Sequence, residues 1–295
     1  MSPSYDDDVR LAHVLADSVE RVTMTRFKAE DLKVDTKPDL TPVTDADRDA
    51  EELIRSQLKR TRPRDAVQGE EFGTTGHGAR RWIIDPIDGT KNYVRGLPVW
   101  ATLIGLVDGD EPVVGLVSAP ALNRRWWAAK GSGAYTGRNL YSAKRIHVSG
   151  VSSIGDASLS YASLGGWRDA GRREEFLQLM DDCWRTRGFG DFWSYMLVAE
   201  GACDLAAEPE LAVHDMAALV PIVTEAGGRM TSLDGSPAPW GGSGARPGET
   251  STSVPVQPSR RRTSTSPRPS ARTSSATWSA SPTTTTVHRP TSARP

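Results

Sequence analysis

The sequence predicts an α+β fold in which helices and antiparallel hairpins pack in layers. Apolar residues recur at helical spacing near the N-terminus, two hairpin patterns occupy the middle of the chain, and helical spacing returns after them. With 37% apolar residues among 295, the chain is long enough to bury a substantial core.

Two helices and a short strand are expected first. Apolar residues recur every three or four positions from Leu11 to Val22, which predicts a helix that reaches about Phe27. A Pro-broken extended segment follows, and a second amphipathic helix ends at Pro63. The short strand then leads into an acidic loop, "GEEFG".

Strands and then helices are expected in the rest of the folded part. "RRWIIDPIDGT" is a run of β-forming residues that should stop at Asp85-Pro86. "VWATLIGLVDGDEPVVGLVSAPA" predicts a hairpin that turns at Asp108-Gly109, and "RRWWAAKGSGAYTGR" predicts another. Helices are expected in "EEFLQLMDDCWR", in "SYMLVAEGACD" and in "DMAALVPIVTEAGG", the last closed by its Gly-Gly pair.

Composition divides the chain near Trp240. Residues 1–240 carry the periodic patterns and are predicted to form the folded domain. Residues 241–295 are rich in Ser, Thr, Pro and Arg and almost lack aliphatic residues. Such a segment cannot bury enough apolar surface to offset the entropy lost on ordering, so a disordered tail is predicted there.

Charge and cysteine content narrow the classes of function. From Arg246 on there are eight arginines and one glutamate, so the part before it is acidic and is not expected to bind nucleic acid. Cys183 and Cys203 lack metal-ligand spacing and are expected to be buried thiols. The sequence shows no signal peptide and no apolar run near the ~20 residues of a membrane span. A soluble, cytoplasmic protein without a membrane partner is therefore expected.

Acidic residues cluster where extended segments meet turns or helix starts. The clusters hold Asp45 and Asp47, Glu70 and Glu71, Asp85 and Asp88 with Thr90, and Asp215. If these segments converge, four or five carboxylates without a cysteine favour Mg²⁺, or Mn²⁺, over Zn²⁺. Two or three such ions beside a phosphate would clamp it for in-line attack by water.

The stretch "DPIDGT" is well suited to such a site. Its proline fixes the chain locally and lets Asp85 and Asp88 face one metal cluster, and the carbonyl of Ile87 can add a ligand. Gly89 and Thr90 can present backbone N–H groups to a phosphate at the start of a helical turn.

Taken singly, each acidic residue has a simpler interpretation. Asp45 and Asp215 would be helix N-caps. Glu71 would lie on a solvated face, and Asp88 would belong to an ordinary turn. The occurrence of four such motifs in one chain favours the metal site over these interpretations.

Three stretches together resemble a known family. "GEE" (69–71), "WIIDPIDGTKNYV" (82–94) and "HDMAALVPIVTEAGG" (214–228) are similar to the motifs of the inositol-monophosphatase-like, Mg²⁺-dependent, Li⁺-sensitive phosphatases. The resemblance covers about residues 9–233. It implies an αβαβα sandwich, a small-molecule phosphate ester as substrate, and assembly as a homodimer.

The resemblance also implies a ligand set. Glu70, Asp85 and the Ile87 carbonyl would hold one Mg²⁺. Asp85, Asp88 and Asp215 would hold a second.

It implies catalytic roles for three further positions. Asp47, together with Glu70, would support a third and weaker ion. Thr90, oriented through Asp47, would help to activate the attacking water. Gly89 and Thr90 would contact the phosphate through their N–H groups.

The residues that select the substrate are expected in the segment between the "DPIDGT" and "HDMAA" motifs. Inositol phosphatases usually carry "GTAA" where this chain has "GFGDFWSY" (188–195). Asp191 replaces a small hydroxyl residue, Trp193 adds an aromatic plane, and Glu208 matches a family position that contacts the distal groups of the substrate. Carboxylates beside an aromatic ring suit a cation that carries a flat ring. "GDFWSYMLVAEGACD" is similar to the histidinol-phosphate phosphatases of the family, so L-histidinol phosphate, an intermediate of histidine biosynthesis, is the expected substrate.

Other interpretations stay open. Trp193 alone would be core packing, and Asp191 alone would be a helix cap. His214, where many relatives have Trp, would be a packing residue or hydrogen-bond partner rather than a metal ligand. The alternative substrates are inositol 1-phosphate or a broad range of sugar phosphates. An alternative of another class is a catalytically inactive regulator that binds Mg²⁺ and a phosphometabolite.

The C-terminus departs from the family pattern. Members continue past "GGRMTSLDG" with a strand and a final helix, whereas this chain runs into the Ser/Thr/Pro/Arg-rich segment. A shifted reading frame near Gly242 would produce this composition, and a genuine extension is the other explanation.

Overall fold

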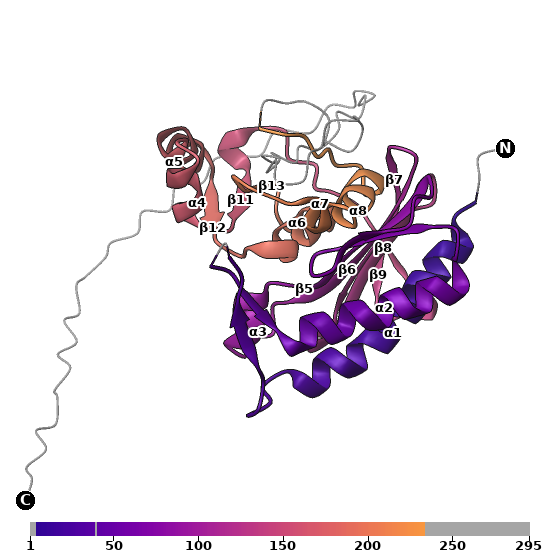
Figure 1. Ribbon diagram of the computed structural model, residues 1–295. Helices are drawn as coiled ribbons and strands as arrows, with labels where there is room; N and C mark the ends of the chain where they lie inside the picture. Colours follow the sequence, from indigo (N-terminus) through magenta and orange to yellow (C-terminus); the bar gives the residue numbers. More distant parts are fainter. Residues whose placement is uncertain (1–3, 39, 234–295) are drawn as a thin grey trace, which may run out of the picture. The chain divides into compact units, whose positions relative to one another are not determined.

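The structure is a computed structural model that describes residues 4–38 and 40–233 (Figure 1). Within these residues, helices and sheets alternate in five layers, which confirms the predicted α+β class and the αβαβα arrangement. The predicted tail over 241–295, and the strand and helix expected to be missing or altered, lie outside the described residues. No helix in the described ranges is long and apolar enough to cross a lipid bilayer.

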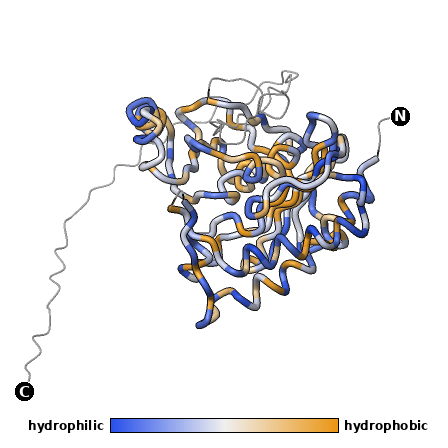
Figure 2. Tube along the Cα trace, in the orientation of Figure 1, coloured by the Kyte–Doolittle hydropathy of each residue, from blue (hydrophilic) through white to orange (hydrophobic). Residues whose placement is uncertain are grey.

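The first layer consists of α1 (Asp6–Arg26) and α2 (Asp45–Thr61), which lie along one face of the large sheet (Figure 1). Hydrophobic and hydrophilic residues alternate along both helices, as Figure 2 shows. Their apolar residues, such as Leu15 and Ile54, pack in one buried cluster with Trp82 of the sheet. Both predicted helices are thereby confirmed.

A short hairpin joins the two helices. Its strands are β1 (Val34–Thr36) and β2 (Pro42–Thr44), which pair antiparallel. The Lys37 N–H donates to the Thr41 carbonyl at 2.8 Å across the turn. The turn matters for function because Lys37 and Thr41 both line the pocket described below.

The large sheet has eight strands in the order β10-β9-β8-β7-β6-β5-β3-β4, and its two predicted hairpins are confirmed. Helices cover both of its faces, so the central strands are nearly continuous apolar runs. In chain order the strands are β3 (Ala66–Gly69), β4 (Gly73–Thr75), β5 (Arg80–Asp88), β6 (Ala101–Asp108), β7 (Glu111–Ala119), β8 (Arg124–Ala129), β9 (Gly133–Gly137) and β10 (Lys144–Ile146).

Strand β5 does not stop at Asp85-Pro86, as the sequence predicted, but continues to Asp88. Its register with β6 shifts between Asp85 and Asp88. Pro86 has no N–H to donate, and a bulge tolerates that loss because the pairing is already interrupted there. On a regular strand, residues three apart point to opposite faces. The irregularity therefore allows both aspartates to reach one site.

The chain turns sharply after β5. Gly89 has a φ of 82°, a left-handed conformation that favours glycine, and α3 (Thr90–Val94) begins directly after it.

Helices α6 (Asp191–Ala199), α7 (Val213–Met216) and α8 (Leu219–Glu225) form the layer on the second face of the large sheet. The single helix predicted from "DMAALVPIVTEAGG" is wrong, because α7 and α8 are separate. Pro221 lacks the N–H that would bond the Ala217 carbonyl in a continuous helix, which explains the break.

Two glycines let this junction sit close to the sheet. A Cβ on Gly105 of β6 would lie 2.6 Å from the Cβ of Ala217, and one on Gly115 of β7 would lie 2.0 Å from the Ala218 carbonyl oxygen. The α7–α8 junction, and with it Asp215, is therefore held at a short distance from the strands that carry the other aspartates.

A small parallel sheet forms the second β layer of the sandwich, and its individual strands were not predicted from the residues. It consists of β11 (Ser158–Tyr161), β12 (Arg185–Arg187) and β13 (Leu205–Ala207) in the order β12-β11-β13. Helices α4 (Leu164–Asp169) and α5 (Arg173–Asp182) share an apolar cluster with it and form the last layer. Strands of three or four residues are too short to show a two-residue period. Short 3₁₀ helices lie at Pro120–Leu122, Leu140–Ser142 and Ile154–Asp156.

The close packing at β7 makes a stability prediction. Gly115→Ala should lower the free energy of unfolding by about 1–3 kcal/mol, because the new methyl group meets backbone atoms that cannot rotate away. Urea unfolding followed by circular dichroism measures this. Gly150→Ala is the matched control, since nothing lies within 4 Å of its Cβ position. Equal midpoints for the two variants would contradict the close approach.

Candidate active site

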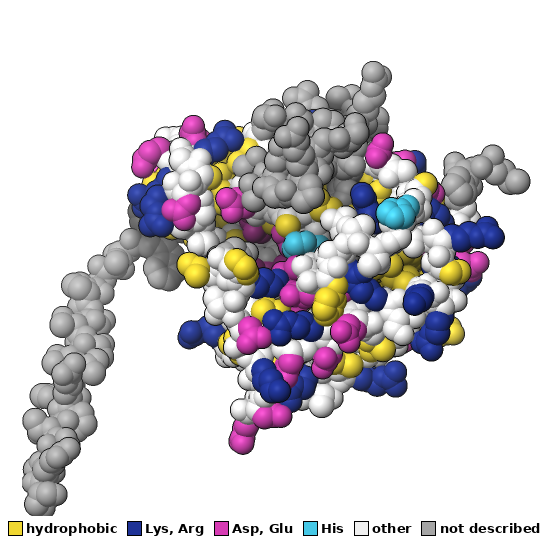
Figure 3. Space-filling model, in the orientation of Figure 1, with side chains coloured by type: hydrophobic (Ala, Val, Ile, Leu, Met, Phe, Trp, Pro, Cys, Tyr) yellow, Lys and Arg dark blue, Asp and Glu magenta, His cyan; other side chains and the backbone are white. Residues whose placement is uncertain are grey.

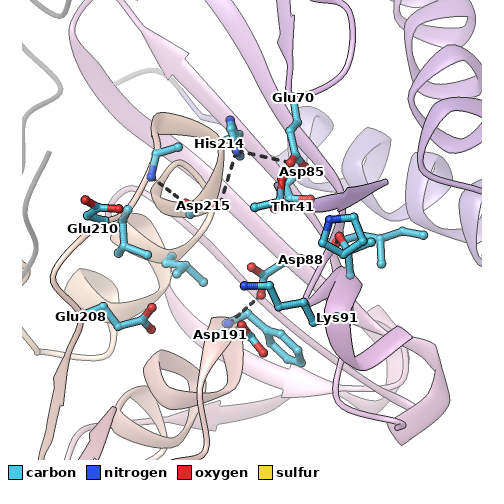
Figure 4. Close-up of a pocket in the computed structure, with 18 of the residues that line it drawn as sticks. Thr41, Glu70, Asp85, Asp88, Lys91, Asp191, Glu208, Glu210, His214 and Asp215 are labelled. Atoms are coloured by element: carbon cyan, nitrogen blue, oxygen red, sulfur yellow. Dashed lines mark hydrogen bonds and ion pairs between the residues drawn. The ribbon is translucent and has the colours of Figure 1, made fainter. Parts of the chain in front are cut away.

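One pocket gathers most of the predicted site residues. Its volume is about 530 Å³, and it lies between the end of β5, the start of α3, the start of α6 and the segment before α7. Figure 3 shows acidic side chains gathered in a hollow on this face, and Figure 4 shows that the labelled ones surround a common space. The predicted residues that line it are Glu70, Asp85, Ile87, Asp88, Gly89, Thr90, Asp191, Glu208 and Asp215.

Two overlapping groups of side chains in the pocket have the spacing to hold metal ions. In the first group, the ligand atoms of Asp85, Asp88 and Asp215 lie within 4.8 Å of one another. In the second, those of Glu70, Asp85 and His214 do so. Asp85 belongs to both groups. We call Glu70, Asp85, Asp88 and Asp215 the carboxylate cluster.

The electrostatics of the cluster fit a divalent cation. Burial and then repulsion by Glu70 and Asp88 raise the pKa of Asp85 well above its usual range. Burial and then repulsion by Asp191 raise the pKa of Asp88 well above its usual range in the same way. Among the described residues, Asp85 Oδ1 is buried without a hydrogen-bond partner. Such an oxygen is costly unless a cation lies against it, and hard carboxylate oxygens are the ligands that Mg²⁺ prefers.

Backbone N–H groups hold two members of the cluster. The Phe192 N–H donates to Asp88 Oδ2 at 2.7 Å, and the Ala212 N–H donates to Asp215 Oδ2 at 2.6 Å. Burial raises the pKa of Asp215, although His214 and this hydrogen bond oppose the shift. The start of α6 and the segment before α7 are thus tied to the same site as β5.

The loop that carries Glu70 is fixed from α2. The buried carboxylate of Glu51 accepts hydrogen bonds from the Glu71 N–H at 2.7 Å and from the Phe72 N–H at 3.2 Å. A Cβ at Gly69 would lie 1.9 Å from Glu51 Oε1, so a larger residue there would require the Glu51 carboxylate to move from these hydrogen bonds.

Lys37 supplies a positive charge that no sequence pattern indicated. Its Nζ lies 2.6 Å from Glu70 Oε1 and 2.6 Å from Glu71 Oε1. Burial lowers the pKa of Lys37, but its hydrogen bonds to Glu70 and Glu71 raise it overall. Lys37 therefore neutralises Glu70 and competes with any metal ion for the same oxygen.

Asp47 is a predicted site residue that does not line the pocket. It lies in the first turn of α2, where its Oδ2 accepts from the Thr44 N–H at 2.9 Å and from the Thr44 hydroxyl at 2.6 Å. Burial raises the pKa of Asp47 to about 7, against these hydrogen bonds. The Thr90 hydroxyl donates to the Ile87 carbonyl at 2.9 Å and not to Asp47. The structure thus brings Thr90 to a predicted ligand rather than to its predicted partner.

Trp193 also lies outside the set of pocket-lining residues. It packs against the main apolar cluster, with its ring centroid 5.8 Å from that of Phe189. Core packing accounts for this placement.

Asp191 is held in the pocket by Asn92. The Asn92 Nδ2 donates to Asp191 Oδ2 at 2.9 Å and to the Val99 carbonyl at 2.9 Å. Asp191 has a φ of 50°, an uncommon conformation for a residue with a side chain. Gly190 occupies the N-cap of α6, and no side-chain capping bond is present there, so Asp191 is not the helix cap.

Asp191 and Glu208 are two further acids that line the pocket, and the pKa of each is raised. Burial and then repulsion by Asp215 raise the pKa of Asp191 to about 6, against Lys91 and Asn92. Burial and then repulsion by Asp191 raise the pKa of Glu208 well above its usual range. A cationic group of a ligand would relieve both.

The sequence reasoning missed several pocket residues. Lys91 follows Thr90 directly, so its position next to "DPIDGT" was a usable signal. Glu210, two residues after Glu208, was another. His214 was expected to be a packing residue or a hydrogen-bond partner rather than a ligand. It lines the pocket, with Nε2 4.0 Å from Glu70 Oε1 and 3.6 Å from Asp215 Oδ1.

The fold and the site together define a class of protein. A layered αβαβα sandwich that gathers carboxylates at the end of an irregular strand is the architecture of a metal-dependent phosphatase. The chain belongs to the inositol monophosphatase family, whose profile matches residues 5–262.

Within this family, the chain is similar in sequence to two histidinol-phosphatases. The histidinol-phosphatase of Streptomyces coelicolor is 64% identical over 247 residues, which cover 82% of this chain and 93% of that protein. The histidinol-phosphatase of Mycobacterium tuberculosis is 58% identical over 238 residues, 80% of this chain and 92% of the relative. Among solved structures, an inositol monophosphatase from Zymomonas mobilis matches with a TM-score of 0.73 at 33% identity. The match covers 86% of this chain and 94% of the Zymomonas chain.

The ion pairs of Lys37 generate a prediction about metal affinity. Lys37→Met should tighten Mg²⁺ binding by roughly tenfold, about 1.4 kcal/mol, because a competing charge leaves Glu70. Isothermal titration of the metal-free protein measures the affinity. Lys59→Met, on the exposed side of α2, is the charge-matched control. Weaker Mg²⁺ binding in Lys37→Met would mean that Lys37 supports the site instead of competing for it.

Proposed function

We propose that this chain is a Mg²⁺-dependent phosphomonoesterase that hydrolyses L-histidinol phosphate to L-histidinol and phosphate. The observation that carries the proposal is one pocket with a carboxylate cluster and, adjoining it, two further acids, Asp191 and Glu208. The cluster has the chemistry to bind metal and phosphate, and the two acids have the charge to bind an ammonium or imidazolium group. The two histidinol-phosphatases that are 58% and 64% identical to the chain support this choice of substrate.

The ligand set of the proposal follows the two groups of side chains. Glu70, Asp85 and the Ile87 carbonyl would hold one Mg²⁺, and Asp85, Asp88 and Asp215 would hold a second. Ions bound there would supply Lewis-acid stabilisation of the phosphate and an activated water for in-line attack. Glu70 with Asp47 would support a third ion.

The chain's own residues orient the reacting groups. Gly89 is the N-cap of α3 and Thr90 is its first residue. The first N–H groups of a helix lack partners within it, so those of Gly89 and Thr90 are available to phosphate oxygens. Lys91 lines the same pocket, and Figure 4 shows it extending over the space beside Asp88. Water adds to phosphorus, the ester P–O bond breaks, and the alcohol leaves with a proton. Thr90, whose hydroxyl contacts the Ile87 carbonyl, would orient the water.

Two accompanying properties belong to the proposal. We propose a cytoplasmic location, because the proposed substrate is an intermediate of biosynthesis. A homodimer is proposed from the family resemblance, and Trp184, 69% exposed, is the kind of side chain that interfaces bury.

A direct assay tests the proposed substrate. Purified protein with Mg²⁺ is given L-histidinol phosphate or myo-inositol 1-phosphate at equal concentrations, and phosphate release is measured. The proposal expects a strong preference for histidinol phosphate. A preference for inositol 1-phosphate, or for sugar phosphates, would reassign the substrate. Absence of release from all of them, with Mg²⁺ bound, would favour a regulator that only binds its ligand.

The metal assignment predicts a loss of activity in Asp85→Asn. Because Asp85 belongs to both ligand groups, kcat should fall by at least about a hundredfold, and Mg²⁺ should bind more weakly. Titration calorimetry and phosphate release measure the two effects. Asp181→Asn, exposed on α5, is the control that should leave both unchanged. Near-normal turnover of Asp85→Asn at low Mg²⁺ would contradict the assignment.

The substrate assignment predicts a pH dependence. With a pKa of about 6, Asp191 is mostly protonated at pH 5 and mostly charged at pH 7, so it attracts a cation only toward the higher pH. The ratio of kcat/KM for histidinol phosphate to that for a neutral sugar phosphate should therefore rise between pH 5 and pH 7. Taking the ratio cancels the ionisation of the phosphate, which both substrates share. The imidazole of histidinol phosphate loses its charge over the same pH range, so comparison with Asp191→Asn isolates the contribution of Asp191.

Substitutions test the separate contributions of Asp191 and Glu208 to substrate preference. Asp191→Asn should flatten this rise in the ratio, and Glu208→Gln should raise KM for histidinol phosphate more than for the neutral ester. Asp191→Asn keeps an oxygen that can accept from Asn92, so the loop geometry is preserved. Equal effects on both substrates would show that Asp191 and Glu208 do not determine substrate specificity.

A further inference from the structure

His214 lies beside the carboxylate cluster, at the start of α7 and directly before Asp215. Its side chain is 24% exposed and extends into the pocket, where Figure 4 shows it between Glu70 and Asp215. The roles proposed above do not use this imidazole.

The distances from His214 to the neighbouring carboxylates would allow them to coordinate the same metal ion. Its Nε2 lies 4.0 Å from Glu70 Oε1 and 3.6 Å from Asp215 Oδ1, and both distances are too long for a hydrogen bond. Two ligands on one ion, with bonds of ~2.0–2.2 Å, lie up to ~4.4 Å apart. Both separations fall within that limit, so an ion can fit between these atoms with small side-chain adjustments.

A second observation points to the same space. Asp85 is 2% exposed, and among the described residues its Oδ1 has no hydrogen-bond partner. Its ligand atom lies within 4.8 Å of those of Glu70 and His214. The group therefore combines a carboxylate that has a buried, unpartnered oxygen, a second carboxylate and an imidazole nitrogen.

We propose that His214 is a nitrogen ligand to the metal ion held by Glu70 and Asp85. This proposal rests on the metal site of the proposed function and deepens it. An imidazole adds little for Mg²⁺, which prefers oxygen, but it strengthens binding of first-row transition-metal ions. His214 thus gives this position a preference for ions such as Mn²⁺ or Zn²⁺ that carboxylates alone would not provide.

The test detects the nitrogen directly and needs no substrate. Metal-free protein is loaded with one equivalent of Mn²⁺, and electron spin-echo envelope modulation is recorded. The proposal expects ¹⁴N coupling of a bound imidazole, replaced by a ¹⁵N pattern when the histidines alone are ¹⁵N-labelled. The labelled wild-type protein gives this answer without any substitution.

Variants assign the signal to one residue. His214→Gln should abolish the histidine coupling and weaken Mn²⁺ binding by about tenfold or more, while Mg²⁺ affinity changes by less than about threefold. His77→Gln, exposed and away from the pocket, is the control and should keep both the coupling and the affinity. Circular dichroism verifies that each variant is folded.

The possible outcomes distinguish failure of the His214 proposal from failure of the carboxylate metal site on which it rests. Mn²⁺ that binds without histidine coupling, or coupling that persists in His214→Gln, would overturn the role of His214 and leave the carboxylate site intact. Absence of Mn²⁺ and Mg²⁺ binding altogether would overturn both proposals. Equal weakening of the two ions in His214→Gln would overturn the preference.

Discussion

Mutual repulsion among closely spaced carboxylates is the constraint on which the rest of this structure depends. Asp85, Asp88 and Asp215 share one small volume, and burial raises the pKa of each. A protein that used these residues only for folding would gain by replacing them with neutral ones. Their presence is explained if divalent cations and a phosphate complete the site, and Lys37 balances part of the charge when they are absent.

The fold holds this unfavourable arrangement by bringing rigid elements together at short range. The irregularity in β5 turns two aspartates to one side, and the glycines of β6 and β7 let the α7–α8 junction approach with the third. Glu51 fixes the loop of Glu70 from a helix on the opposite face of the sheet. Separate parts of the chain thus position the carboxylates together, which couples metal binding at this cluster to the complete fold.

The sequence predicted much of the fold and of the site. It failed for the features that contacts between distant parts of the chain determine. The hairpins, the first two helices and the residues of the carboxylate cluster follow from local patterns. The break between α7 and α8 follows from Pro221 and from packing on Gly105 and Gly115, while the strands of the small sheet are too short to show a period. The ion pair of Lys37 with Glu70 joins residues 33 positions apart, so no local pattern could show it. Asn92 was missed for the same reason, because its partner Asp191 is 99 residues away.

The most direct test of the central claim is the melting temperature of the metal-free protein across a MgCl₂ series at constant ionic strength. If cations relieve the repulsion within the carboxylate cluster, the melting temperature should rise with Mg²⁺ in a saturable manner and follow the binding isotherm. NaCl at the same ionic strength should reproduce little of the rise. A melting temperature that does not respond to Mg²⁺, or responds equally to NaCl, would contradict the account.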